Sequence, residues 1–255
     1  MDKIRFLNGN TLKLIAAVLM VFDHAAILFL PYGSVTYTVF RSLGRIAFPL
    51  FAYMLAEGCH YTKDKLKHFA LLFSVAVFCQ VVYYFFDNGN LEMSVLITFS
   101  LSTLAIYALQ YFKKSLFSKE TGIIDKIFAG GLFAATVIVI YELNEKFSID
   151  YGFWGCMLPV FVSLFDLKDV PMPENSRVKA ILDNEYTRFL CFALGLALLA
   201  AFYYPVWGNI QLYSFFSLVI LLFYNGKKGK LNLKYFFYAF YPLHLVLLQG
   251  IAWLL

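Results

Sequence analysis

Charged residues are scarce in this chain, and their scarcity excludes an ordinary water-soluble domain. Only 15% of the 255 residues are charged, whereas 61% are hydrophobic and 20% are aromatic. Soluble globular domains are usually about 45–50% apolar and about 25% charged. Together with a mean hydropathy of +0.71, the composition indicates a chain whose surroundings are membrane lipid.

Several motifs of common chemistries are also absent. No HxxxH pair, CxxC pair, Walker or Rossmann glycine pattern, or GxSxG nucleophile elbow occurs, so we expect no metal ion and no hydrolase triad. The four cysteines are far apart in apolar runs, where buried free thiols are the ordinary interpretation: Cys59, Cys79, Cys156 and Cys191.

Nine apolar runs reach the length of about 17–25 residues that a membrane helix needs. They fall near residues 12–30, 38–58, 68–86, 93–112, 125–142, 149–165, 187–205, 209–224 and 235–254. No cleavage site follows the first run, so we expect a retained helix rather than a signal peptide. The pattern predicts an all-α, polytopic bundle of about nine transmembrane helices in one domain, residues 1–255.

The positive charges predict the orientation of this bundle. Eighteen of the 21 Lys and Arg residues fall in the N-terminal segment and in the even-numbered connectors, all on one side. Because cytoplasmic loops carry an excess of Lys and Arg, we expect the N-terminus in the cytoplasm and the C-terminus outside. The same distribution explains the net charge of +5 without a nucleic-acid partner.

Four ionisable residues lie deep within the apolar runs. Asp23 and His24 occupy the middle of the first run, and a translocon scale assigns an Asp at a helix centre a cost of roughly 2.5–3.5 kcal/mol. At about 1.5 Å per residue, His244 in the ninth run lies at a similar depth, and Arg45 in the second lies in the outer half. We therefore expect Asp23, His24, Arg45 and His244 to converge on a cavity.

Plainer interpretations of these and other residues stay open. Asp23 and Arg45 would also serve as a structural ion pair, and each histidine as an interhelical hydrogen bond. Glu57 would extend its carboxylate to the membrane surface, and Asp150 would cap the sixth helix. The lysines of NGKKGK, residues 225–230, would be an ordinary cytoplasmic anchor.

The converging residues suit two kinds of chemistry. A histidine near a carboxylate and an arginine can act as a general base while the arginine stabilises developing negative charge. The same groups can relay protons in a transporter. The inverted repeats that are common in transporters are not visible in this sequence.

Four segments resemble the TraX family of membrane acetyltransferases, in the same order and across nearly the whole chain. They are LKLIAAVLMVFDHAA, LGRIAFPLFAYMLAEG, DYGFWG and YNGKKGKLNLKYFFYAFYPLHL, the last being the most specific. The resemblance implies an enzyme of the bacterial inner membrane that transfers an acetyl group from acetyl-CoA to an acceptor. The family's namesake acetylates the N-terminal amine of a conjugative pilin.

The resemblance and the predicted depths together suggest roles for individual residues. One of His24 and His244 would deprotonate the acceptor, Asp23 would hold an imidazole in its working tautomer, and Arg45 would stabilise the oxyanion. Acetyl-CoA would enter from the cytoplasm and meet the segment that contains Asn225, Lys227, Lys228 and Lys230. The acceptor, a pilin-type peptide, a glycan or a lipid, would contact Asp150, Tyr151 and Glu57.

Two rival functions remain. A proton-coupled transporter or flippase of a small acylated compound would move its substrate without consuming acetyl-CoA. A non-catalytic assembly factor would tolerate alanine at His24 and Arg45.

Overall fold

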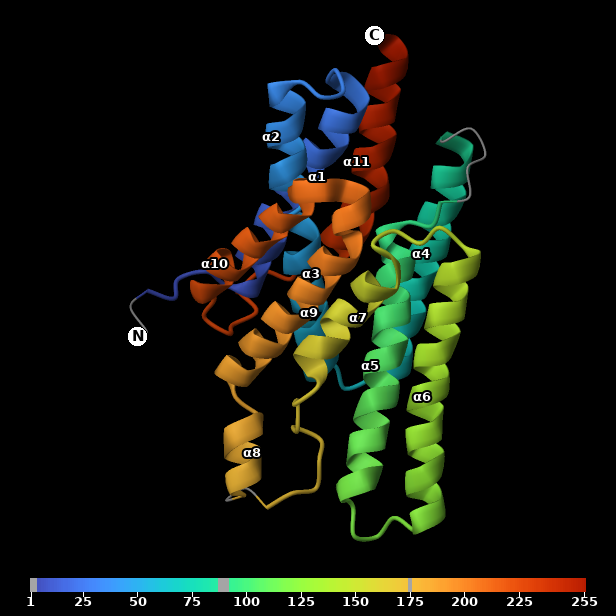
Figure 1. Cartoon of the computed structure of the whole chain (residues 1–255), viewed down its shortest axis with the longest axis vertical. Helices are drawn as coiled ribbons and strands as arrows, with labels where there is room; N and C mark the ends of the chain where they lie inside the picture. Colours follow the sequence, from blue (N-terminus) through green and yellow to red (C-terminus); the bar gives the residue numbers. More distant parts are fainter. Residues whose placement is uncertain (1–3, 87–91, 174–175) are drawn as a thin grey trace. The chain divides into compact units, whose positions relative to one another are not determined.

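The computed structural model describes residues 4–86, 92–173 and 176–255. In these residues every secondary-structure element longer than an isolated bridge is a helix (Figure 1). Lys3, one of the positive charges of the N-terminal segment, lies outside the described residues. The elements are α1 (Gly9–Phe29), α2 (Val35–Gly44), α3 (Ala47–Tyr61), α4 (Lys65–Phe86), α5 (Val95–Phe117), α6 (Ile123–Lys146), α7 (Gly152–Ser163), α8 (Arg177–Leu182), α9 (Glu185–Trp207), the 3₁₀ helix η1 (Gly208–Phe215), α10 (Phe216–Leu222) and α11 (Lys234–Leu254).

Seven helical segments of the described chain are long and apolar enough to cross a membrane, counting α2 and α3 as one. The sixth and eighth predicted spans form shorter helices. α7 has 12 residues, about 18 Å of helix, against a hydrocarbon core of about 30 Å. The structure thus has the all-helical, polytopic architecture predicted from the sequence, while the count of nine and the orientation stay predictions.

The second predicted span is broken where the sequence suggested a continuous helix. α2 ends at Gly44, and Arg45 and Ile46 form a turn before α3 begins at Ala47. The backbone N–H of Arg45 donates to the carbonyl of Arg41, and that of Ile46 to Leu43. Internal bonds at the break matter because lipid cannot satisfy free backbone groups.

The chain divides into two compact units, and α3, α4 and α9 contribute residues to both. The first unit contains residues 1–54, 78–90 and 196–255. Within it α1 lies beside both α2 and α11 (Figure 1). α1 begins where the Asn8 side chain accepts a hydrogen bond from the backbone N–H of Thr11, which is a standard helix start.

The second unit contains residues 55–77 and 91–195, with α5 packed against α6 and α7. Small residues on α5 allow this close packing, as is common between membrane helices. Ala105 is fully buried, and the Ser102 hydroxyl donates to the Cys156 carbonyl at 2.8 Å. Cys59, Ile106 and Met157 belong to the same buried core.

Candidate active site

Two histidines from opposite ends of the sequence meet in the first unit. Nε2 of His244 on α11 lies 3.3 Å from Nδ1 of His24 on α1, and the ring centroids are 5.0 Å apart. Each Nδ1 also lies 3.0 Å from a backbone carbonyl four residues earlier, that of Met20 for His24 and that of Phe240 for His244. Both rings are thus held by their own helix and by each other.

Aromatic residues of α11 fix the ring of His244. Phe240, one helical turn earlier, stacks on the imidazole with ring centroids 5.1 Å apart and an interplanar angle of 8°. Tyr241 meets the same imidazole edge-on. As whole residues, His244 is only 5% exposed and His24 is partly exposed.

Asp23 binds two arginines rather than a histidine. Its Oδ2 lies 2.7 Å from Nη1 of Arg41 and 3.6 Å from Nη2 of Arg45. The nearer partner is Arg41, a residue near the start of the second predicted span for which no site role was predicted. Arg45 is buried beside it at the break between α2 and α3.

The tautomer-holding role expected of Asp23 falls to backbone carbonyls instead. Consecutive helical residues point about 100° apart, so the Asp23 carboxylate faces Arg41 and Arg45 while His24 faces His244 on α11. The atoms that lie against the imidazole Nδ1 atoms are the carbonyl oxygens of Met20 and Phe240.

Gly44 allows α2 to lie directly against Asp23. A Cβ added to Gly44 would overlap the Cβ, Cγ and Oδ1 atoms of Asp23. Oδ1 is buried and has no hydrogen-bond partner among the described residues. The carboxylate is therefore confined between the glycine and the arginine side chains.

The segment 225–230 wraps around the N-terminus of α1. The carbonyls of Lys227 and Lys228 accept hydrogen bonds from the backbone N–H groups of Gly9 and Asn10 at 2.7 and 3.0 Å. Helix N-termini have free N–H groups that often bind anions, but here the loop itself occupies them. Any phosphate recognition would therefore fall to the lysine side chains.

The side chains of this segment divide into two groups. Lys227, Lys228 and Lys230 are exposed. Asn225 is used within the turn, where its Oδ1 accepts from the N–H of Lys227 at 2.9 Å. Gly229 has a left-handed backbone (φ +97°), and a Cβ there would contact the side chains of Asn8 and Asn10. The glycine thus permits the close fit of the loop to α1.

The three residues assigned to the acceptor belong to the second unit. Glu57 forms an ion pair with Arg188 at 3.3 Å. Asp150 precedes α7 by two positions, and the residue that caps α7 is Tyr151. Tyr151 is the only described non-glycine residue with a positive φ, +59°, which is an uncommon conformation for a bulky side chain.

A second polar centre, which the sequence analysis did not identify, lies at the end of α3. Nδ1 of His60 donates to Oδ2 of Asp166 at 2.7 Å, and Arg188 lies 3.9 Å from the other oxygen. Burial alone would raise the pKa of the Asp166 carboxyl. The hydrogen bond and charge of His60, the backbone N–H of Lys168 and the Arg188 guanidinium outweigh burial and lower the pKa to about 2.

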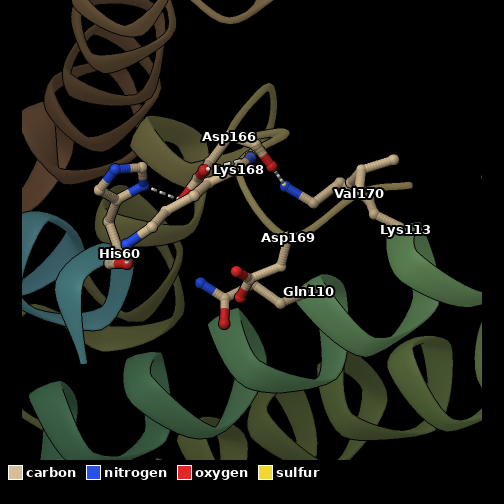
Figure 2. A pocket seen from close by; sticks show the side chains of 7 residues that line it. All are labelled: His60, Gln110, Lys113, Asp166, Lys168, Asp169 and Val170. Carbon is tan, nitrogen blue, oxygen red and sulfur yellow. Dashed lines mark hydrogen bonds and ion pairs between the residues drawn. The ribbon is translucent and has the colours of Figure 1, made fainter. Parts of the chain in front are cut away.

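Lys113 on α5 completes this centre by capping α7. Its buried ammonium donates to the carbonyls of Ser163, Leu164 and Asp166 at 2.7, 3.3 and 2.6 Å. The last carbonyls of a helix have no partner within the helix and attract positive charge. Figure 2 shows Lys113 reaching toward Asp166, which faces His60 on its other side.

The cavity at this centre is too small for a substrate. It is lined by His60, Gln110, Lys113, Asp166, Lys168, Asp169 and Val170 (Figure 2), and its volume is about 10 Å³. That volume corresponds to about one water molecule. Among all the described residues, no three His, Cys, Asp or Glu side chains gather as metal ligands, and the expectation about metals stays a prediction.

Two signals in the sequence could have pointed to the second centre. Lys113 directly follows the predicted fourth span, and His60 lies two residues beyond the end of the second. Both stand near membrane boundaries, where charged residues are normally counted as topology markers. Their partner Asp166 lies in a long connector, and sequence spacing cannot reveal that contact.

Comparison with known proteins identifies the family. Residues 8–252 match the family model described as TraX protein. A probable fimbrial assembly protein FimC, serogroup H1, from Dichelobacter nodosus is 26% identical over 259 residues, which cover 93% of this chain and 92% of that protein. No solved structure matches the chain. The family match covers nearly the whole chain and agrees with the resemblance of its four motifs, so the chain belongs to the TraX family.

Proposed function

We propose that this protein is a membrane-embedded acetyltransferase that moves an acetyl group from acetyl-CoA to an amine or a hydroxyl. The observation that carries the proposal is the 3.3 Å contact between His24 and His244 in the unit where Asp23 holds Arg41 and Arg45. Acyl transfer needs a base for the attacking group and positive charge near the developing oxyanion. Membership of the TraX family supports the same activity.

The geometry of the first unit is suited to a long donor molecule. The lysine segment contacts α1 at Gly9, and His24 is 15 residues further along the same helix, about 22 Å at the usual helical rise. That separation is comparable to the reach of an extended pantetheine arm. Lys227, Lys228 and Lys230 would bind the phosphates, because lysine is a common phosphate partner.

The positive charges around Asp23 would stabilise the oxyanion that forms when the acceptor attacks the thioester. Two arginines face one carboxylate, so one positive charge is left over. Asp23 would orient the arginines, and Arg45 would stabilise the oxyanion as the acceptor attacks the thioester. Asp150, Tyr151 and Glu57 remain predictions for the acceptor side.

The name of the Dichelobacter nodosus relative suggests a class of acceptor. That protein is described as a fimbrial assembly protein, and fimbriae are built from pilin subunits. We propose a pilin-type peptide N-terminus as the acceptor, with a glycan or a lipid as the alternative. The site would lie in the bacterial inner membrane and take its donor from the cytoplasm.

Acetyl-CoA binding is the first test of this proposal. We would purify the protein in nanodiscs and measure its thermal stability with acetyl-CoA, with CoA and with neither. The double variant Lys227→Ala/Lys228→Ala should lose most of the stabilisation. A matched control, Lys114→Ala/Lys119→Ala, removes two exposed lysines from the second unit and should keep it.

The opposite outcome would favour the transporter. If millimolar acetyl-CoA does not stabilise folded protein, the acetyltransferase proposal is wrong. Asp23 and His24 would then be candidates for a proton relay, and uptake of a small acylated compound into proteoliposomes would be the next assay.

A further inference from the structure

The hydrogen-bond partners of the histidine pair determine where its protons lie. A carbonyl oxygen only accepts hydrogen bonds, so an imidazole nitrogen that faces one must carry a proton. Nδ1 of His24 faces the carbonyl of Met20, and Nδ1 of His244 faces the carbonyl of Phe240, both at 3.0 Å. Both neutral rings are therefore in the Nδ1–H tautomer.

This proton placement gives the contact between the rings a direction. Nε2 of a neutral Nδ1–H imidazole carries a lone pair and accepts hydrogen bonds. The proton on Nδ1 of His24 is thus shared between the Met20 carbonyl and Nε2 of His244, 3.3 Å away. The lone pair of His244 is used inside the pair, whereas that of Nε2 on His24 is directed away from it.

From this arrangement we infer that His24 is the general base of the acetyl transfer and that His244 is a positioning residue that acts through it. The inference rests on the proposed function. The packing of His244 agrees with it, because Phe240 stacks on its imidazole and Tyr241 meets the same ring edge-on.

The transfer step balances with these roles. The acceptor nitrogen or oxygen forms a bond to the thioester carbonyl carbon, and its proton passes to Nε2 of His24. The carbon–sulfur bond then breaks, and the imidazolium returns the proton to the CoA thiolate. While His24 is positively charged, its Nδ1–H donates more strongly to His244, which stabilises the imidazolium.

The first part of the test determines the histidine tautomers by NMR and does not require acetyl transfer. Protein labelled with ¹⁵N-histidine in nanodiscs should give protonated Nδ1 and unprotonated Nε2 signals for both His24 and His244. His24→Gln and His244→Gln variants assign the signals among the four histidines. An Nε2–H tautomer at either ring would overturn the inference.

The second part compares acetyl transfer in matched variants. His24→Gln should lower kcat by about 10²–10⁴-fold, the usual contribution of a general base, and should abolish the acidic limb of the pH profile, where protonation of the base stops the wild-type reaction. His244→Gln keeps an acceptor oxygen for His24 and should lose much less activity, whereas His244→Phe removes the acceptor and should lose more. The neighbouring charges, Asp23 on α1, Arg41 on α2 and Arg45 at the break that follows α2, are unchanged in all three.

His68→Gln is the control for replacing a histidine, because His68 belongs to the second unit and bonds Tyr107. The inference fails if His24→Gln keeps the acidic limb of the pH profile, or if His244→Gln is as inactive as His24→Gln. Absence of acetyl transfer in the wild-type protein would reject the proposed function instead, since the nitrogen spectra do not depend on turnover.

Discussion

At the scale of single residues, Gly44 decides where the Asp23 side chain can lie. In Gly44→Ala the new methyl group would overlap Asp23, so the carboxylate must leave Arg41 or α2 must move. We expect a loss of about 1–3 kcal/mol in stability, the usual cost of forcing an extra methyl into a packed site, together with lower acetyl transfer. Thermal unfolding in detergent measures the first effect.

Gly131→Ala is the matched control for this substitution. Gly131 lies in α6 with nothing within 4 Å of an added Cβ, and alanine favours a helix over glycine by up to about 1 kcal/mol. This variant should be as stable as the wild type or more so. Equal stability of the two alanine variants would contradict the packing argument.

The lowered pKa of the Asp166 carboxyl makes the stability of the folded protein depend on pH. Its pKa of about 2 lies below the ordinary 3.8, so folding favours the ionised carboxylate. The stabilisation, on the order of 2 kcal/mol, is fully present above about pH 4 and is lost as the pH falls toward 2. Asp166→Asn should be less stable than wild type at pH 6, and the difference in unfolding temperature should shrink between pH 4 and pH 2.

The sequence predicts some site residues better than others, for a physical reason. His24 and His244 stand out because an imidazole deep within an apolar run needs a polar partner, and helical rise gives their depths. Lys113 and Arg188 were interpreted as loop charges because they stand at the ends of predicted spans. The structure buries the ammonium of Lys113 against three carbonyls, a use that hydropathy cannot distinguish from solvent exposure.

At the scale of helices, α7 depends on a lysine from another element. Lys113→Met would keep most of the side-chain volume but remove the ammonium from the carbonyls of Ser163, Leu164 and Asp166. The Ser163 carbonyl would keep the backbone N–H of Asp166 as a donor. Buried polar groups that lose a partner typically cost about 1–3 kcal/mol each. Lys113→Met should therefore lower the unfolding temperature strongly, whereas Lys114→Met, at an exposed neighbouring position, should not. Similar unfolding temperatures would show that the cap is dispensable.

The loop at 225–230 offers a comparison between two glycines. Gly229 and Gly208 both have positive φ, but an added Cβ meets Asn8 and Asn10 only at Gly229, while Gly208 has nothing within 4 Å. Both alanine variants should lose about 1–2 kcal/mol from backbone strain. Only Gly229→Ala should also weaken stabilisation by acetyl-CoA, because the lysine segment would lose its fit to α1. If acetyl-CoA raises the unfolding temperatures of Gly229→Ala and Gly208→Ala equally, the fit of this loop to α1 does not contribute to donor binding.

The helical elements follow from hydropathy, but their interruptions do not. All nine apolar runs become helical, as their composition predicts. Window-averaged hydropathy does not detect the break at Arg45, because the value of one arginine is averaged with those of its apolar neighbours. Hydropathy does not predict the short length of α7 either, because the apolar residues beyond its ends adopt other backbone conformations.

At the scale of the whole molecule, the predicted orientation can be tested with single cysteines. Lys119→Cys lies between α5 and α6, and Glu145→Cys lies near the far end of α6, both at exposed positions. If the N-terminus is cytoplasmic, a membrane-impermeant maleimide should label Glu145→Cys in intact cells and Lys119→Cys only after permeabilisation. The wild-type chain gives the background from its own four cysteines. The reverse labelling pattern would show that the orientation is opposite to the one predicted.

The pairing of His24 with His244 has a consequence for biosynthesis. The two residues are 220 positions apart, and ribosomes add about 5–20 residues per second, so α1 waits on the order of 10–40 seconds for its partner. The carbonyls that cover the start of α1 also come from the late segment 227–228. The first helix to emerge is thus among the last to gain its partners, and the histidine pair forms only after the final helix has been synthesised.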